Sequence, residues 1–261
     1  MRSLDIAATG MRAQQTNVDV ISHNLANITT TGYKRQRAEF QDLIYQNLER
    51  VGTNSSDTGT IVPVGVQIGL GVKTGAVTRD HVQGTMKQTE NALDVAIQGR
   101  GYLIVETPNG EDTYTRDGTL KLSPDGEIVT KEGYTVRPSI TVPDDAISVS
   151  INASGEVEVT IDGQVDPVNL GQLEMATFIN DAGLEALGNN YYKETPASGN
   201  PIEGLPGEEG FGTLLQGYIE NANVDPVNEI TSLIVAQRSY EMNSKVITAS
   251  DEMLQALNQS A

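Results

Sequence analysis

The last stretch of the chain, residues 225–258, constrains the fold more than any other part. Asp225 is a favourable helix N-cap, Pro226 suits the first helical position, and neither Pro nor Gly occurs after it. The pattern predicts one helix about 50 Å long, at about 1.5 Å per residue. Any fold for this chain must therefore accommodate a long, unbroken C-terminal helix.

Two apolar stripes, rather than one, run along this predicted helix. The first steps by three and four residues through Leu233, Ala236, Tyr240, Asn243, Ile247, Ser250, Leu254 and Leu257. The second is displaced by two residues and contains Val235, Ser239, Met242, Val246, Ala249, Met253 and Ala256. A surface helix needs one apolar face. Two stripes fit either a central helix buried in its own domain or a helix that also meets a neighbouring copy, and this stretch alone leaves both open.

A second long helix is predicted near the N-terminus, over residues 3–28. Its heptad seam contains Leu4, Ala8, Met11, Gln15, Val18, Ser22 and Leu25. The polar seam members and Gly10 make it a poor independent helix, because an interior Gly costs about 1 kcal/mol relative to Ala. The C-terminal helix is the only other long seam, so we expect the two ends to pair as a coiled coil. Such a pair would be marginal alone, which predicts that the ends become ordered only when copies stack.

Composition excludes several classes of protein and site. The chain has 261 residues with no Cys and no Trp, which removes disulfides, thiolate metal sites and Cys nucleophiles. No apolar run reaches the ~18 residues of a membrane span, and no cleavable signal peptide is predicted. The net charge is −18, and residues 101–225 hold 5 basic and 22 acidic side chains. A nucleic-acid binder needs a basic footprint, so we expect no nucleic-acid partner and interpret the acidic block as solvated surface.

The middle of the chain is predicted to be mainly β. Residues 35–60 begin with partly helical spacing at Phe40, Leu43, Ile44 and Leu48 and then become a long polar loop over 52–59. Strands are predicted within 61–77, on both sides of a Gly-x-Gly bend at 99–101, and within 214–224, with a loop-rich stretch at 179–210. From about 97 to 178 we predict a β meander, with turns at Asn109-Gly110, Asp117-Gly118, Asp125-Gly126, Glu132-Gly133, Ser154-Gly155 and Asp162-Gly163.

Catalytic signals are absent from the sequence. His23 and His81 are the only His residues, and hydrolase, metalloprotease and phosphate-loop patterns do not occur. Asp144-Asp145 and Glu208-Glu209 lie in predicted loops, where solvated charge is the ordinary interpretation. We therefore expect no enzyme activity, no metal and no cofactor.

The end of the N-terminal helix carries the most specific motif, over residues 22–34. Asn27 and the three Thr that follow at 29–31 compete for backbone hydrogen bonds and end the helix, and Gly32 permits a left-handed turn before Tyr33. The pattern S-x-N-L-A-N-x-x-T-x-G-[FY]-K after an amphipathic helix resembles the signature of the bacterial flagellar rod and hook proteins. Residues 94–102, 114–118, 216–224 and 236–245 resemble further segments of that family. The resemblance thus spans the chain, and it is strongest to the distal rod type because of the short chain, the linker at 46–66 and residues 177–184.

This resemblance implies an α+β fold with long paired terminal helices, an extended β connector and an inserted antiparallel β domain. The expected division is 1–30 for the N-terminal helix, 31–96 for the connector, 97–204 for the β domain, 205–224 for the return strand and 225–261 for the C-terminal helix. The implied function is a structural subunit of the flagellar distal rod that self-assembles into a hollow helical tube, transmits torque and passes exported subunits. A proximal rod or hook protein, a surface adhesin or glycan-binding β module, and an enzyme are the alternatives.

The implied partners are other copies of the chain, proximal rod proteins, the hook protein, the bushing ring proteins of the outer membrane and peptidoglycan, and the flagellar type III export apparatus. The implied location is the periplasm-spanning rod of the basal body, reached without a cleaved signal and without membrane insertion. The residues expected to carry assembly are Leu4, Met11, Val18, Asn24, Leu25, Asn27, Thr30, Gly32, Tyr33, Leu233, Tyr240, Met242, Val246, Ile247, Met253 and Leu254.

Overall fold

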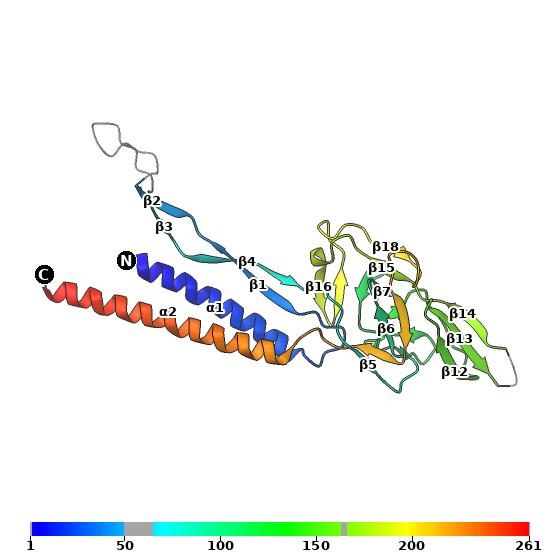
Figure 1. Ribbon diagram of the computed structural model, residues 1–261. Coiled ribbons are helices and arrows are strands. Elements are labelled where there is room, and N and C mark those ends of the chain that lie inside the picture. Colours follow the sequence, from blue (N-terminus) through cyan, green and yellow to red (C-terminus); the bar gives the residue numbers. More distant parts are fainter. Residues whose placement is uncertain (1, 50–64, 163–165, 261) are drawn as a thin grey trace. The chain divides into compact units, whose positions relative to one another are not determined.

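The computed structural model describes residues 2–49, 65–162 and 166–260 (Figure 1). It has the predicted α+β composition, with an N-terminal helix, many antiparallel strands and a C-terminal helix. The chain forms two compact units. The helical unit contains Met1–Leu25, Gln36–Thr78 and Asp225–Ala261, and the β unit contains Ala26–Arg35 and Arg79–Val224.

Two long helices dominate the helical unit, α1 (Arg2–Ala26) and α2 (Pro226–Ser260). The predicted start of α2 is confirmed, because Asp225 Oδ1 accepts hydrogen bonds from the backbone N–H of Val227 at 2.9 Å and of Asn228 at 3.4 Å. This side chain satisfies backbone donors that the first helical turn leaves unpaired. No helix in the described part of the chain is long and apolar enough to cross a membrane.

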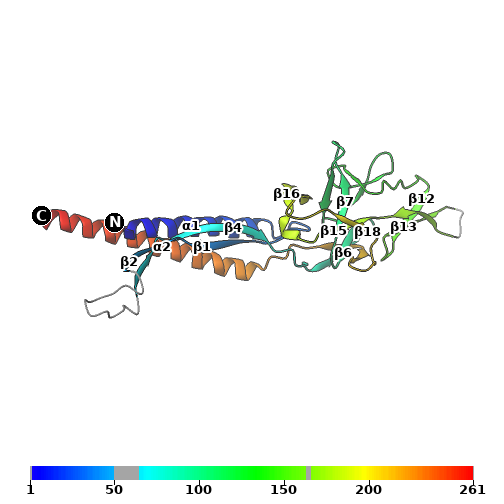
Figure 2. The same cartoon turned by 90° about the horizontal axis from the view of Figure 1, so that it is seen from above.

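The two helices lie side by side and run antiparallel (Figures 1 and 2). Ser3 Oγ and Ser250 Oγ are 3.2 Å apart, and Asn24 Nδ2 donates to Glu229 Oε2 at 3.2 Å. Between these contacts, a Cβ placed on Gly10 would lie 2.9 Å from Asn243 Nδ2. Moving along α1 from residue 3 to 10 to 24 matches moving back along α2 from 250 to 243 to 229. The contacts therefore follow a seven-residue repeat.

The buried face of α1 differs slightly from the predicted seam. Its buried residues are Ala7, Ala13, Val20, Ile21 and Asn24, whereas the seam members Leu4, Met11, Val18 and Leu25 are half-buried. Small residues allow the backbones of two helices to approach closely, and Gly10 occupies such a close approach. The large seam residues consequently lie at the margin of the α1–α2 contact.

The strands of the helical unit overturn one sequence prediction. β1 (Gln36–Asp42) pairs with β4 (Val72–Arg79), and β2 (Tyr45–Glu49) pairs antiparallel with β3 (Val66–Gly69). The helical spacing predicted from Phe40 to Leu48 was therefore wrong, because pairing with two strands later in the chain, β4 and β3, decides the conformation of this stretch. The predicted loop at 52–59 and the first predicted strand residues at 61–64 lie outside the described residues.

The β unit contains the remaining strands. They are β5 (Met86–Gln88), β6 (Val95–Gln98), β7 (Tyr102–Glu106), β8 (Asp112–Thr115), β9 (Lys121–Leu122), β10 (Ile128–Val129), β11 (Thr135–Val136), β12 (Ala146–Ile151), β13 (Glu156–Ile161), β14 (Val168–Gln172), β15 (Met175–Thr177), β16 (Glu185–Gly188), β17 (Tyr191–Lys193), β18 (Ile202–Gly204), β19 (Thr213–Gln216) and β20 (Tyr218–Glu220). A short 3₁₀ turn, η1, spans Asp181–Gly183. The two strands predicted around the bend at 99–101 are confirmed as β6 and β7.

The largest sheet is not a simple meander. Its strand order is β16-β17-β8-β7-β11-β10-β9, with β15 pairing to both β7 and β18. The other pairings are β12-β13-β14, β19 with β6, and β20 with β5. Alternating hydrophobicity predicts strands but not their partners. The predicted return strand at 205–224 appears as two strands, β19 and β20, which pair with β6 and β5.

Most of the predicted turns are confirmed, and one is wrong. Gly110, Gly126, Gly133 and Gly155 have positive φ angles between +75° and +86° and lie in hairpin connections. Gly118 is different, because the chain continues past it to an isolated bridge between Thr119 and Asp94. A Cβ on Gly118 would overlap the carbonyl oxygen of Val95, so this glycine serves a close backbone approach. The turn predicted at Asp162-Gly163 reaches outside the described residues.

Candidate assembly surface and its anchor

The helical unit exposes many large apolar side chains and buries few. Its buried apolar residues in the described part are Ala7, Ala13, Val20, Ile21 and Ala236. Its exposed large apolar residues are Ile6, Ile44, Tyr45, Leu48, Val66, Leu70, Val77, Val227, Ile230, Ile234, Val235, Tyr240, Met242, Val246 and Met253. In the β unit, by contrast, the strands enclose a large apolar core that includes Ile97, Leu103, Val105 and Val157. Large exposed apolar patches are typical of interaction sites, which makes this surface the candidate for assembly.

The predicted assembly residues of α2 fall on two faces of that helix. Met242, Val246 and Met253 are exposed by 59%, 46% and 55%. Leu233, Ile247 and Leu254 are half-buried, and Tyr240 is 43% exposed. We call Met242, Val246 and Met253, together with Val235 at 59% exposure, the outer stripe. The half-buried residues lie on the α1 side, together with the buried Ala236 and Ser250.

Asn24, at the end of α1, joins three segments of the helical unit. Its Nδ2 donates to the carbonyl oxygen of Gln36 at 2.8 Å and to Glu229 Oε2 at 3.2 Å. Its Oδ1 accepts from the backbone N–H of Gln36 at 2.8 Å. The side chain is 1% exposed. Asn24 thus fixes the ends of α1, β1 and α2 together, which gives the motif residue a structural role.

Replacing Asn24 by Asp is expected to destabilise the helical unit by about 3 kcal/mol. The isosteric carboxylate cannot donate to Gln36 or Glu229, and it adds a negative charge beside the Glu229 carboxylate. The measurement is the midpoint of the loss of helical circular dichroism at 222 nm on heating the full chain. Asn47→Asp, at an exposed position of β2, is the matched control. Equal midpoints for the two variants would contradict the role of Asn24.

The turn after α1 belongs to the β unit, and the other motif residues build it. Thr30 Oγ1 donates to Asn27 Oδ1 at 3.1 Å, and Gly32 has a φ of +69° as predicted. The N–H of Gly32 donates to the carbonyl oxygen of Glu220 at 2.8 Å, and a Cβ there would lie 3.0 Å from the backbone of Arg116. Tyr33 is buried in a small apolar cluster with Ala222, Val224 and Ile28. Gly32 is therefore required both by its conformation and by its close packing.

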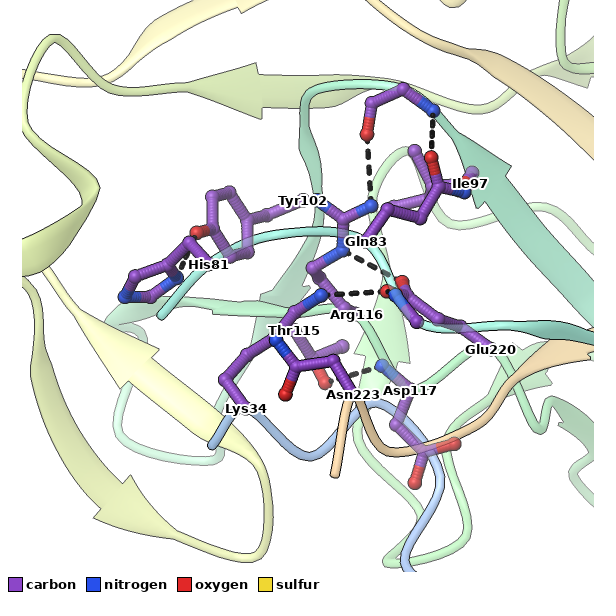
Figure 3. Close-up of polar contacts among 12 residues, drawn as sticks. Lys34, His81, Gln83, Ile97, Tyr102, Thr115, Arg116, Asp117, Glu220 and Asn223 are labelled. Carbon is purple, nitrogen blue, oxygen red and sulfur yellow. Dashed lines mark hydrogen bonds and ion pairs between the residues drawn. The ribbon is translucent and has the colours of Figure 1, made fainter. Parts of the chain in front are cut away.

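A buried ion cluster of Lys34, Arg116 and Glu220 lies next to this turn (Figure 3). Lys34 Nζ donates to Glu220 Oε1 at 2.6 Å, and Arg116 Nε donates to Glu220 Oε2 at 2.9 Å. The carboxylate also accepts from the N–H of Gly84 at 2.7 Å, while Lys34 and Arg116 donate to the carbonyl oxygens of Val82 and Gly99. All three side chains are at most 4% exposed.

Burial and the neighbouring charges shift the pKa values of Glu220 and Lys34. Burial alone would raise the pKa of Glu220, but Arg116 and Lys34 and the hydrogen bonds to Lys34 and Gly84 outweigh it and lower that pKa. Burial, followed by the charge of Arg116, lowers the pKa of Lys34, although Glu220 opposes this shift. The carboxylate is thus held ionised between two cations, and the arrangement ties Lys34, β20 and the segment after β8 together within the β unit.

Asn223 makes a second connection in the same region (Figure 3). Its Oδ1 accepts from the backbone N–H of Arg35 at 2.7 Å, and its Nδ2 donates to the carbonyl oxygens of Asp80 and Val82 at 2.8 and 2.9 Å. Nearby, Tyr102 Oη and His81 Nδ1 form a hydrogen bond of 2.8 Å. Burial, with smaller contributions from Lys34, Arg79 and Arg116, lowers the pKa of His81 to about 4, against the opposing charge of Asp181.

The lowered pKa of His81 predicts a specific loss of stability in mild acid. Because the folded-state pKa lies below the unfolded value of 6.5, the stabilisation is complete above pH 6.5 and is lost as the pH falls toward 4. We expect the free energy of unfolding in urea to fall by about 2 kcal/mol between pH 7 and pH 5. His81→Asn keeps an acceptor near Tyr102 and should remove most of this fall. An unchanged pH dependence in that variant would contradict the assignment.

The described residues contain no group of three or more His, Asp or Glu side chains placed to hold a metal ion. The polar clusters instead connect backbone segments: Asn24 in the helical unit, and the ion cluster and Asn223 in the β unit. The exposed surface that remains as a candidate site is therefore the set of apolar side chains on the helical unit.

Comparison with known proteins identifies this architecture. The family described as "Flagella basal body rod protein" matches residues 4–34, "Flagellar hook protein FlgE/F/G D1 domain" matches 96–159, and "Flagellar basal body rod FlgEFG protein C-terminal" matches 215–260. The flagellar basal-body rod protein FlgG of Caulobacter vibrioides is 55% identical over 259 residues, which cover 99% of both chains. The chain belongs to the flagellar basal-body rod protein family.

Other members of the family support the same assignment. The basal-body rod protein FlgG of Agrobacterium fabrum is 51% identical over 97% of both chains, and that of Bacillus subtilis is 38% identical over 98% of both. The chain is thus a structural subunit of the flagellar rod, located in the basal body. The matches confirm the resemblance that the motif at residues 22–34 indicated.

The ion cluster is the part of the site that the sequence interpretation did not identify. A usable signal was nevertheless present. Lys34, Arg116 and Glu220 each lie in a segment that carried the resemblance to the rod family, at 22–34, 114–118 and 216–224. Opposite charges in separate family-specific segments indicate a buried pair when those segments meet.

Proposed function

We propose that this rod subunit acts in the distal rod, where copies assemble through their helical units into a hollow helical tube that transmits torque. The single observation that supports this is the outer stripe of α2, together with the other exposed apolar residues of a unit that buries few large side chains itself. Burying one large apolar side chain yields about 1.5–3 kcal/mol, so stacking copies would supply the core that one copy lacks. The similar proteins named FlgG support the distal position.

Within each copy, we propose that α1 and α2 form an antiparallel coiled coil. The seven-residue repeat of their contacts supports this, since coiled coils repeat their seam with that period. The division into a terminal-helix domain at 1–30 and 225–261, a connector at 31–96 and 205–224 and a β domain at 97–204 also stays a proposal. The two compact units are a coarser division of the chain.

The proposed partners are those of a shaft component. They are other copies of the chain, proximal rod proteins, the hook protein, the bushing rings and the type III export apparatus, with later subunits passing through the tube. We propose no catalytic activity and no cofactor, in keeping with a structural family. The acidic surface of residues 101–225 would keep the shaft from adhering to anionic surroundings.

Sedimentation and circular dichroism of the purified full chain test this function. The wild-type chain should form large assemblies above a critical concentration, with the helical signal at 222 nm rising together with assembly. Met242→Asp should raise that critical concentration about tenfold or more, because a charge in a buried interface is costly. Asn109→Asp, at an exposed site of the β unit, is the control. A stably helical monomer at every concentration would rule out assembly-coupled ordering.

A further inference from the structure

A hollow lies on one side of the α1–α2 pair. Val18 and Tyr240 line this hollow of about 420 Å³ together with Gln15, Gln237 and Glu241. The contacts between the helices repeat every seven residues, so the positions seven residues away lie on the same side of the pair, and we call this whole side the groove. These are Met11 and Ile247 in one direction and Leu25 and Leu233 in the other, and all four are half-buried. The groove therefore presents apolar side chains about every 10.5 Å along the helices.

The outer stripe repeats with the same period on a different face of α2. Val235 and Met242 are seven residues apart, and so are Val246 and Met253. At 100° per residue, this stripe points roughly away from the groove side of α2. Apolar knobs spaced by seven residues fit a helical groove with the same spacing, as in knobs-into-holes packing.

The charges beside the two surfaces are complementary. Arg238 and Lys245 are the basic residues of α2, and each follows an outer-stripe residue, Val235 or Met242, by three positions. Both are exposed. Glu241 lines the hollow, and the exposed Asp19 follows Val18. Among the described residues, no ion pair engages Arg238, Lys245 or Glu241.

We propose that the outer stripe of one copy docks into the α1–α2 groove of a second copy, with Arg238 and Lys245 next to Glu241 of that copy. Because stripe and groove are different faces, a docked pair keeps one free groove, on the first copy, and one free stripe, on the second. The contact is therefore heterologous and propagates from copy to copy. This inference rests on the proposed assembly function and specifies which surfaces of the helical unit meet.

Disulfide cross-linking between two full-length variants tests the docking. The chain contains no Cys, so every disulfide formed would report an engineered pair. A copy carrying Met242→Cys is mixed, before assembly, with a size-tagged copy carrying Met11→Cys, Val18→Cys or Leu25→Cys. After mild oxidation of the assembled fraction, one of the three groove positions should give a strong mixed dimer. Val235→Cys should then cross-link to a groove position seven residues away.

The control is Thr248→Cys, on the same helix and also exposed, seven residues from Glu241 and hence on the groove side. It should give at least tenfold less mixed dimer than Met242→Cys. Assemblies in which Met242→Cys cross-links to no groove position, or no better than Thr248→Cys, would overturn the docking while leaving the assembly function intact. A chain that never assembles would overturn both.

Charge reversal provides an independent readout that needs no cysteine. The double variant R238E/K245E should raise the critical concentration for assembly about tenfold, because it sets like charges beside Glu241. Within one helix these residues are three and four positions apart, so the rescue must come from another copy. Mixing the double variant with copies that carry Glu241→Lys alone should recover a large part of the loss. If the mixture assembles no better than the double variant, the proposed pairing of these charges is wrong.

Discussion

Replacing Glu220 by Gln destabilises the β unit by an expected 3–5 kcal/mol, a large fraction of the stability of an ordinary domain. Glu220 accepts four hydrogen bonds, from Lys34, Arg116, Gly84 and, through its backbone carbonyl, Gly32. Of these, the first three depend on the side chain. Without its negative charge, two buried cations face each other and lose the group that offsets their desolvation. Removing one partner of a buried ion pair is costly for this reason.

The measurement is urea unfolding of the full chain, monitored by tyrosine fluorescence, since most Tyr residues lie in the β unit. Glu209→Gln removes the same charge at an exposed site and should change the unfolding free energy by less than about 0.5 kcal/mol. Lys34→Met leaves the Arg116–Glu220 pair intact, so it should cost less than Glu220→Gln. If Lys34→Met proved the more destabilising variant, the central role of the carboxylate would be refuted.

Replacing Gly118 by Ala is the second change with a large expected effect, at about 3 kcal/mol or more. The added Cβ would overlap the carbonyl oxygen of Val95, which is a backbone atom of a completely buried residue and cannot move aside. The same backbone stretch carries hydrogen bonds from Val95 N–H and Leu120 N–H to the carbonyl oxygen of Gly118, at 2.9 and 3.0 Å. Relieving the overlap would break these bonds and displace β6 from its place in the core.

Gly110→Ala is the matched control for that prediction. Gly110 has a φ of +75°, but nothing lies within 4 Å of the position of its Cβ. Alanine there incurs only the conformational cost of a left-handed backbone, about 1 kcal/mol. Thermal unfolding of both variants should therefore give a clearly lower melting temperature for Gly118→Ala. Similar melting temperatures would contradict the prediction, because they would mean that Val95 can move away from an alanine at position 118 without destabilising the β unit.

Local signals explain why some elements could be predicted from the sequence and others could not. The start of α2 follows from Asp225 and Pro226, and the end of α1 from the polar run after it, because capping depends on residues a few positions apart. The stretch from Phe40 to Leu48 was misjudged because its strand partners, β4 and β3, come later in the sequence, after residue 65. Gly118 looked like a turn residue for the same reason, since Val95 is distant in sequence.

The candidate site divides in the same way. The motif identified Asn24, Gly32 and Tyr33, whose importance is visible in their chemical type and spacing. The ion cluster was missed because Lys34, Arg116 and Glu220 come from three separate segments, and each looks like an ordinary charged residue alone. The exposure of Met242, Val246 and Met253 also needed the structure, because the period of a stripe does not tell which of two stripes is covered. Their role in assembly stays a prediction.

The ion cluster has a consequence for the order in which the chain folds. Glu220 follows Lys34 by 186 positions and Arg116 by 104. A ribosome releases the N-terminal end first, so Lys34 and the turn at Gly32 exist for most of synthesis without the strand that completes them. Contacts of such high sequence separation form slowly, because a long loop must close first. Closure of β20 onto β5 is therefore expected to be the late, rate-limiting event for the β unit, and until then a newly made chain stays incompletely folded.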